Sequence, residues 1–117
     1  MTKANVTMNT RKIKEGLSVI DIRGEINAFA ESPLMDAYNQ ATNEGAKTIL
    51  LNFKDLGYMN SSGIGLLVTL LIRVKRQNQR LLACELSEHY QQIFELTRLN
   101  EAISIYPNEA VAVTSVG

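Results

Sequence analysis

Short apolar runs alternate with amphipathic segments along the 117-residue chain. Residues 5–12 alternate weakly between apolar and polar positions, and residues 17–22 (LSVIDI) are rich in β-branched side chains, so the intervening KEG predicts a hairpin. Residues 47–53 (KTILLNF) form an apolar run between turn residues, which is typical of a strand covered on both faces. Residues 80–86 (RLLACEL) and 102–106 (AISIY) predict two more strands.

The first predicted helix lies within residues 30–45 (AESPLMDAYNQATNEG). Its apolar residues recur at helical spacing, at Leu34, Met35, Tyr38 and Ala41. Ser32 is the expected N-cap, Pro33 suits the first helical position, and Gly45 is the expected stop.

Two further helices are expected after the third strand. One runs from Ser62 or Gly63 to about Gln77, and it is apolar nearly all round in its first three turns, which indicates deep packing. The other spans residues 87–99 and is opened by Ser87. Beyond them, the segment after Asn108 reads either as a short terminal helix or as an irregular or extended tail.

This order of elements predicts an α/β fold with a mostly parallel sheet, helices packed against it and right-handed crossovers. In sheets of this kind, binding sites gather where strand ends lead into helix N-termini. Residues 54–62 (KDLGYMNSS) are expected to form such a loop.

Length and charge narrow the class of protein. A chain of 117 residues suits one domain, 1–117, and twelve basic residues balance twelve acidic ones, so no global charge draws it to nucleic acid or to an anionic membrane. The one cysteine, Cys84, lies in an apolar run and is expected to be buried and reduced. With no signal peptide and no apolar run of membrane-spanning length, we expect a cytoplasmic protein.

Residues for catalysis are sparse. His89 is the only histidine and no Cys/His cluster accompanies it, so neither a metal site nor a cofactor is expected. Phosphate-binding and dinucleotide-binding glycine patterns are absent. A nucleophilic Ser61 would need His89 within reach as a base, and nothing in the spacing requires that, so we expect no enzyme activity.

Arg73, Lys75, Arg76 and Arg80 form a basic cluster near the end of the long helix. Cations are favourable at a helix C-terminus, and this explanation is the simpler one. A docking patch for an acidic partner is the alternative.

The stretch Asn60–Ser61–Ser62 holds three strong N-cap types, where one cap is sufficient, and Asn60 is the expected cap. A serine at a helix N-terminus is also suited to phosphorylation, because the phosphate would meet free N–H groups and the helix dipole. Gly63 and Gly65 each cost about 1 kcal/mol of helix propensity. Either a partner approaches closely there or the helix packs tightly on its own sheet.

Two motifs resemble the STAS-domain proteins, the anti-sigma-factor antagonist family. GEIN at residues 24–27 is similar to the family's G-E-[LI]-D, and LNFKDLGYMNSSGIGLL at residues 51–67 is similar to its strand, D-S-[ST]-G loop and apolar helix. The resemblance covers nearly the whole chain in element order. It implies a STAS-type fold, with a mixed sheet of four or five strands, a parallel crossover core and helices mainly on one side.

The resemblance also implies a function. Such proteins bind a serine kinase that doubles as an anti-sigma factor, and phosphorylation of the loop serine ends that binding until a serine phosphatase restores it. The phosphorylated residue here would be Ser61, on a protein that is monomeric when free. The implied partner surface comprises Asn27, Tyr58, Met59, Asn60, Ser61, Ser62 and Gly63. Residues 26–32 (INAFAES), after the second strand, are a candidate extension of it.

Asn27 and Asn60 depart from the family pattern, which has aspartate at both positions. Asparagine keeps the shape and the capping ability of aspartate but removes its charge, so it repels an incoming phosphate less. The alternative to a phospho-switch is a STAS scaffold subunit of a larger signalling complex that lacks one.

Overall fold

The computed structural model describes residues 5–116. In chain order the elements are β1 (Val6–Lys14), β2 (Leu17–Ile26), the 3₁₀ turn η1 (Ala28–Ala30), α1 (Glu31–Asn43), β3 (Thr48–Met59), α2 (Ser61–Arg76), β4 (Arg80–Cys84), α3 (Glu88–Leu96), the 3₁₀ turn η2 (Leu99–Glu101), β5 (Ser104–Tyr106) and α4 (Glu109–Ser115). No helix formed by these residues is both long enough and apolar enough to cross a bilayer.

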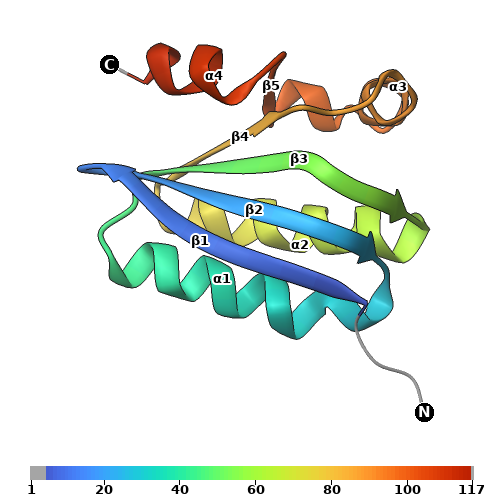
Figure 1. Ribbon diagram of the computed structural model, residues 1–117, viewed down its shortest axis with the longest axis horizontal. Coiled ribbons are helices and arrows are strands. Elements are labelled where there is room, and N and C mark those ends of the chain that lie inside the picture. Colours follow the sequence, from blue (N-terminus) through green and yellow to red (C-terminus); the bar gives the residue numbers. More distant parts are fainter. Residues whose placement is uncertain (1–4, 117) are drawn as a thin grey trace.

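The strands form one sheet in the order β1-β2-β3-β4-β5 (Figure 1). β1 pairs with β2 antiparallel, through a tight turn at Gly16 (φ +82°), and every later neighbouring pair is parallel. The predicted α/β fold, with a mixed sheet that is mostly parallel, is confirmed.

Helices cover the two faces of the sheet unequally. α1 and α2 lie on one face and α4 lies on the other (Figure 1). The larger core is built on the α1 and α2 side, around buried residues such as Ile20, Leu51 and Phe94. The smaller core places Ala112 of α4 with Cys84 of β4, so the expected burial of Cys84 is confirmed.

The start of α1 differs from the prediction. Ser32 is not the N-cap, because the chain already turns at η1 and α1 begins at Glu31 without a side-chain cap. Pro33 is therefore the third residue of the helix and not the first, and its missing N–H still costs no helical hydrogen bond there. Gly45, with φ +89°, follows the helix end as predicted.

β3 is longer than predicted, because residues 54–59 are strand and not loop. The register between β2 and β3 shifts twice, once after Asp21 and once after Gly24, and pairing then resumes to the end of both strands. These bulges interrupt the regular alternation of apolar residues, which is why the pattern hid the second half of the strand.

The other predicted elements are present with small changes at their ends. α2 begins at Ser61, one residue before Ser62 and two before Gly63, the two expected starts. Ser87 caps α3 by accepting a hydrogen bond from the Tyr90 N–H. The segment after Asn108 is a helix, α4, so the tail is neither irregular nor extended up to Ser115.

Candidate partner-binding site

The candidate site lies where β2 and β3 end side by side. Ile26 is the register partner of Met59, and the Asn60 N–H donates to the Ile26 carbonyl oxygen at 3.2 Å. The residues that follow the two strands, Asn27 and Asn60, are thereby held at the same edge of the sheet.

Each of these asparagines starts a helical segment. The Asn27 Oδ1 accepts from the Phe29 N–H at 2.9 Å, and the Asn60 Oδ1 accepts from the Gly63 N–H at 2.9 Å. Both side chains therefore act as N-caps, a role that an aspartate would fill equally well. The expected capping by Asn60 is confirmed, and capping by Asn27 was not foreseen because η1 is a single short turn.

Close packing explains one of the two glycines in α2. A Cβ atom on Gly63 would overlap the Ile26 carbonyl oxygen and crowd the Met59 side chain. A Cβ atom on Gly65 would meet nothing within 4 Å. Packing on its own sheet therefore accounts for Gly63, whereas the exposed Gly65 has no internal reason to be small.

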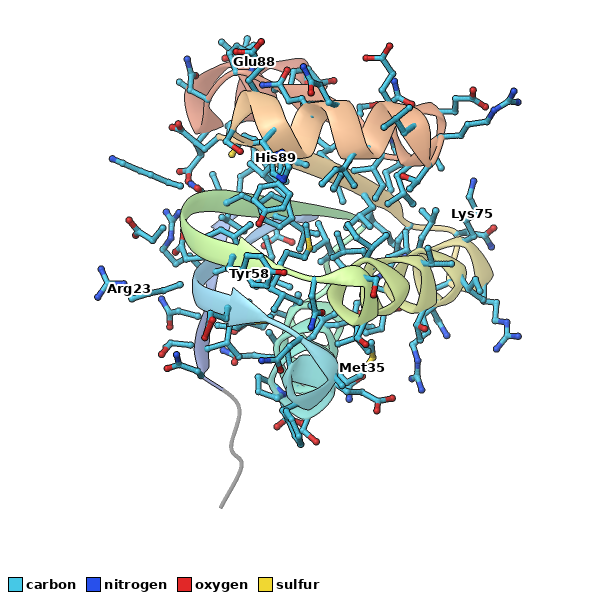
Figure 2. The ribbon with its side chains drawn as sticks, turned by 90° about the vertical axis from the view of Figure 1, so that its right-hand side faces the viewer. Arg23, Met35, Tyr58, Lys75, Glu88 and His89 are labelled. Carbon is cyan, nitrogen blue, oxygen red and sulfur yellow. The ribbon has the colours of Figure 1, made fainter. Side chains whose placement is uncertain are left out.

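Exposure separates the expected contact residues. Ser61 and Ser62 are exposed at the start of α2, and Tyr58 is 53% exposed at the end of β3. Figure 2 looks onto this edge of the sheet and labels Tyr58 there. Phe29, which the sequence analysis did not single out, is 50% exposed because the Asn27 cap turns its segment outward.

Met59 is buried, with 4% of its surface exposed, so the expectation that its side chain is open to a partner is wrong. Its N–H donates to the Tyr90 hydroxyl oxygen at 2.8 Å, which ties α3 to the end of β3. The strand alternation that turns Tyr58 outward turns Met59 into the core. Ile64, in the first turn of α2, is half-buried.

His89 is not placed to act as a base for Ser61 or Ser62. It is exposed on α3, its ring contacts the Tyr90 ring edge-on, and it forms no hydrogen bond with Ser61 or Ser62. Within residues 5–116, no three His, Cys, Asp or Glu side chains are grouped so that they could hold a metal ion.

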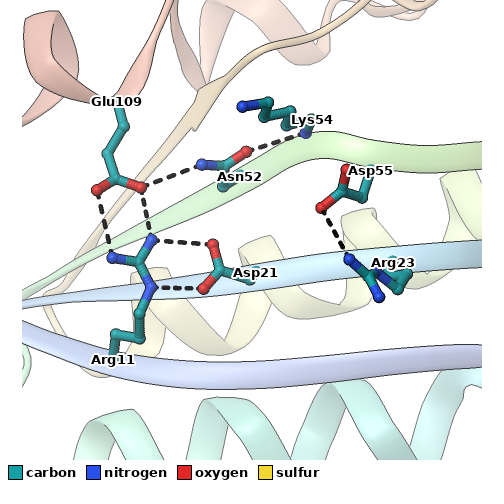
Figure 3. Close-up of polar contacts among 7 residues, drawn as sticks. All are labelled: Arg11, Asp21, Arg23, Asn52, Lys54, Asp55 and Glu109. Atoms are coloured by element: carbon teal, nitrogen blue, oxygen red, sulfur yellow. Dashed lines mark hydrogen bonds and ion pairs between the residues drawn. The ribbon is translucent and has the colours of Figure 1, made fainter.

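A second polar centre lies away from the serines, on the face of the sheet that α4 partly covers (Figure 3). The Arg11 guanidinium donates to Asp21 at 2.9 Å and to Glu109 at 2.6 Å, and Asn52 also donates to Glu109. These bonds raise the pKa of Arg11 and lower the pKa of the Glu109 carboxyl. The sequence analysis missed this network because Arg11 and Glu109 are far apart in the chain.

Comparison with known proteins decides the family. A family model for the STAS domain matches residues 9–112. The chain belongs to the STAS-domain family. The family suggested by the motifs at residues 24–27 and 51–67 is thus confirmed. The two motifs contain the ends of β2 and β3, which pair with each other in the sheet.

Curated relatives carry a functional name. The chain is 29% identical over 101 residues to the anti-sigma-B factor antagonist of Bacillus subtilis (strain 168), covering 86% of this STAS domain protein and 91% of the relative. It is 24% identical over 94 residues to the protein of the same name from Staphylococcus aureus (strain NCTC 8325 / PS 47), covering 80% and 85%.

Solved structures share the fold. An anti-sigma factor antagonist from Mycobacterium paratuberculosis superposes with a TM-score of 0.79 at 18% identity, covering 98% of each chain. The Bacillus cell fate determinant SpoIIAA in its phosphorylated form superposes with a TM-score of 0.74 at 21% identity, covering 95% of this chain and all (100%) of that one. At these identities the likeness establishes the STAS fold.

Proposed function

We propose that this STAS domain protein is an anti-sigma factor antagonist, which binds a serine kinase that is also an anti-sigma factor and is released by phosphorylation of Ser61. The names of its curated relatives support the class of function. The observation that carries the switch is the position of Ser61, exposed and first in α2, beside the joined ends of β2 and β3.

The physical case for Ser61 rests on its backbone. The first N–H groups of a helix have no intrahelical partner, and here Asn60 satisfies only that of Gly63. A phosphate on the Ser61 hydroxyl would lie at the positive end of the α2 dipole and add roughly two negative charges to the surface. A kinase-binding surface that fits the neutral hydroxyl would lose affinity through charge and bulk.

Two exposed aromatic side chains extend this surface, Tyr58 near the end of β3 and Phe29 on η1, directly after β2. Large aromatic residues carry much of the binding energy in protein interfaces, because they bury apolar area at a small cost in entropy. Both lie in regular secondary structure, at the end of β3 and on η1, so the backbone that carries them is already ordered before binding.

The two asparagines modify the switch without removing the binding surface. Asn27 and Asn60 supply the caps but no negative charge beside Ser61. Phosphorylation of Ser61 therefore adds its negative charge where the two cap side chains carry none. Removal of the phosphate requires a serine phosphatase.

Phosphorylation is tested by mass spectrometry of the protein from its native cells, with and without the candidate kinase. The expected result is a phosphate on Ser61 that depends on the kinase. A protein that carries no phosphate on Ser61 under any condition contradicts the switch and favours the scaffold subunit, for which light scattering would show self-assembly.

Binding is tested by titrating the kinase with Ser61→Asp, Ser61→Ala and Ser62→Asp variants. Ser61→Asp should weaken binding at least about tenfold, which corresponds to about 1.4 kcal/mol, and Ser61→Ala should bind like the unmodified protein. Ser62→Asp adds the same charge one residue further along α2 and serves as the matched control, with a smaller loss. Equal binding by all variants would place the kinase surface elsewhere.

A further inference from the structure

A cleft lies between the last turns of α1 and α2, at the opposite end of α2 from Ser61. Its volume is about 310 Å³. The lining residues are Tyr38, Asn39, Thr42, Arg73, Arg76 and Gln77. Two guanidinium groups and several hydroxyl and amide groups therefore face this cleft, and no carboxylate does.

Arg73 and Arg76 have no ionic partner among residues 5–116. The acidic residues of the neighbouring helix α1, Glu31 and Asp36, form no ion pair with them, and neither does Glu44 directly after that helix. Two unpaired cations in one cleft create a local positive field, although the whole chain has a formal net charge of zero.

The end of α2 does not need these guanidinium groups as hydrogen-bond donors. The Arg73 carbonyl accepts from the Gln77 N–H at 3.1 Å, and the Lys75 carbonyl accepts from the Asn78 N–H at 3.1 Å. The Val74 carbonyl accepts from the Gln79 N–H at 2.9 Å. The backbone thus closes the helix, and the side chains of Arg73 and Arg76 stay available for a ligand.

The four basic residues near the end of α2 line two different pockets. Lys75 and Arg80 line a different pocket, on the side of β4 and β5, together with Leu82 and Ser104. Only Arg73 and Arg76 share the cleft with α1. The two pairs carry the same charge at the same end of α2, so each is a control for the other.

The outward face of α2 connects the cleft to the proposed kinase-binding surface. Ser61, Gly65, Val68, Ile72 and Arg76 are all exposed and recur at helical spacing. At 1.5 Å per residue this row is roughly 22 Å long, which is within the span of an ordinary protein interface. The exposed Gly65, which internal packing does not explain, lies in the same row.

We propose that the Arg73 and Arg76 cleft binds an acidic segment of the same protein partner that covers Ser61. The inference rests on the proposed function and names a second contact of that partner. Guanidinium groups pair with carboxylates through two parallel N–H···O bonds, and the i, i+3 spacing lets two neighbouring carboxylates bind together.

The cleft is tested first without the partner, by NMR of ¹⁵N-labelled protein titrated with hexaglutamate. The amides of Thr42, Arg76 and Gln77 should shift, and the shifts should decrease as salt is added. In the Arg73→Gln/Arg76→Gln variant the affinity should fall at least about fivefold, whereas Lys75→Gln/Arg80→Gln should retain it. An equal loss in both variants, or shifts spread over the whole surface, would overturn the assignment of the cleft.

The partner is tested next, by measuring its association rate with both double variants at low salt. Arg73→Gln/Arg76→Gln should slow association at least about fivefold and flatten its salt dependence, and the control pair should do so less. Equal rates for both would overturn the proposal. Ser61→Asp is measured in parallel: if it leaves partner binding unchanged while the cleft variant weakens it, the phospho-switch fails and the cleft contact holds.

Discussion

The carbonyl oxygen of Ile26 lies so close to Gly63 that no side-chain atom fits between them. The same carbonyl oxygen accepts the hydrogen bond from the Asn60 N–H, so it joins the end of β2 both to the N-cap and to the first turn of α2. The backbone around Ser61 is therefore positioned by main-chain packing, independently of the serine side chains.

Gly63→Ala is expected to destabilise the protein by roughly 1–3 kcal/mol, because the added methyl group pushes α2 away from Ile26. Gly65→Ala is the matched control. It adds the same methyl group where nothing lies within 4 Å, and it should stabilise the helix by up to about 1 kcal/mol. Urea unfolding of both variants measures the difference, and equal midpoints would show that the contact at Gly63 is loose.

Two substitutions of Asn60 distinguish the effect of its N-cap hydrogen bond from the effect of lacking the negative charge of an aspartate. Asn60→Ala should cost about 1 kcal/mol of unfolding free energy, because the Gly63 N–H loses its acceptor. Asn60→Asp keeps the acceptor and adds a negative charge at the helix N-terminus, so it should be at least as stable as the parent at neutral pH. Thermal or urea unfolding at pH 7 measures both; a stable Ala variant would contradict the role of the cap.

Local signals in the sequence were sufficient for most of the fold and for the centre of the site. Apolar spacing located all five strands and α1 to α3, and the three cap-type residues at 60–62 marked the start of α2. The choice between internal packing and partner approach at Gly63 needed coordinates, because the Ile26 carbonyl that decides it belongs to another strand.

Other features depend on contacts that are distant in the chain. The outward Phe29 depends on a single turn capped by Asn27, which has too few residues to show a period. The division of the basic cluster depends on which helix or strand packs beside each cation. The pairing of Arg11 with Glu109 bridges 98 residues and has no local signature.

Acid should weaken the contact between α4 and the sheet. The Arg11 guanidinium holds the pKa of the Glu109 carboxyl below its usual range, so the unfolded chain takes up this proton at a higher pH than the native protein does. The contribution of Glu109 to stability is therefore complete above the ordinary glutamate pKa of about 4.3, and it is lost as the pH falls below that value through the native pKa.

Glu109→Gln should remove this part of the pH dependence and cost roughly 0.5–1 kcal/mol at pH 7, as expected for a partly exposed ion pair. Urea midpoints measured from pH 7 down to pH 3 provide the test. Glu15→Gln is the control, because the Glu15 side chain is 95% exposed and its pair with Lys12 should contribute little. Identical pH profiles for the two variants would contradict a special role for Glu109.

Cys84 should report on the same contact. Burial, with a smaller contribution from Glu109, raises the pKa of its thiol to about 12, so almost no reactive thiolate is present at pH 8. Its side chain packs in one cluster with Ala112 of α4, so we expect a thiol reagent to reach it when α4 leaves the sheet.

Labelling of Cys84 by a disulfide reagent at pH 8 should therefore be slow in the native protein and rapid in concentrated urea. Glu109→Gln weakens the attachment of α4 and should speed native labelling several-fold, while Glu15→Gln should leave the rate unchanged. If the native protein reacts as fast as the urea-unfolded chain, α4 does not protect the thiol. If only global unfolding exposes it, the labelling rate of every variant will follow its unfolding free energy, and Glu109 will have no separate effect on α4.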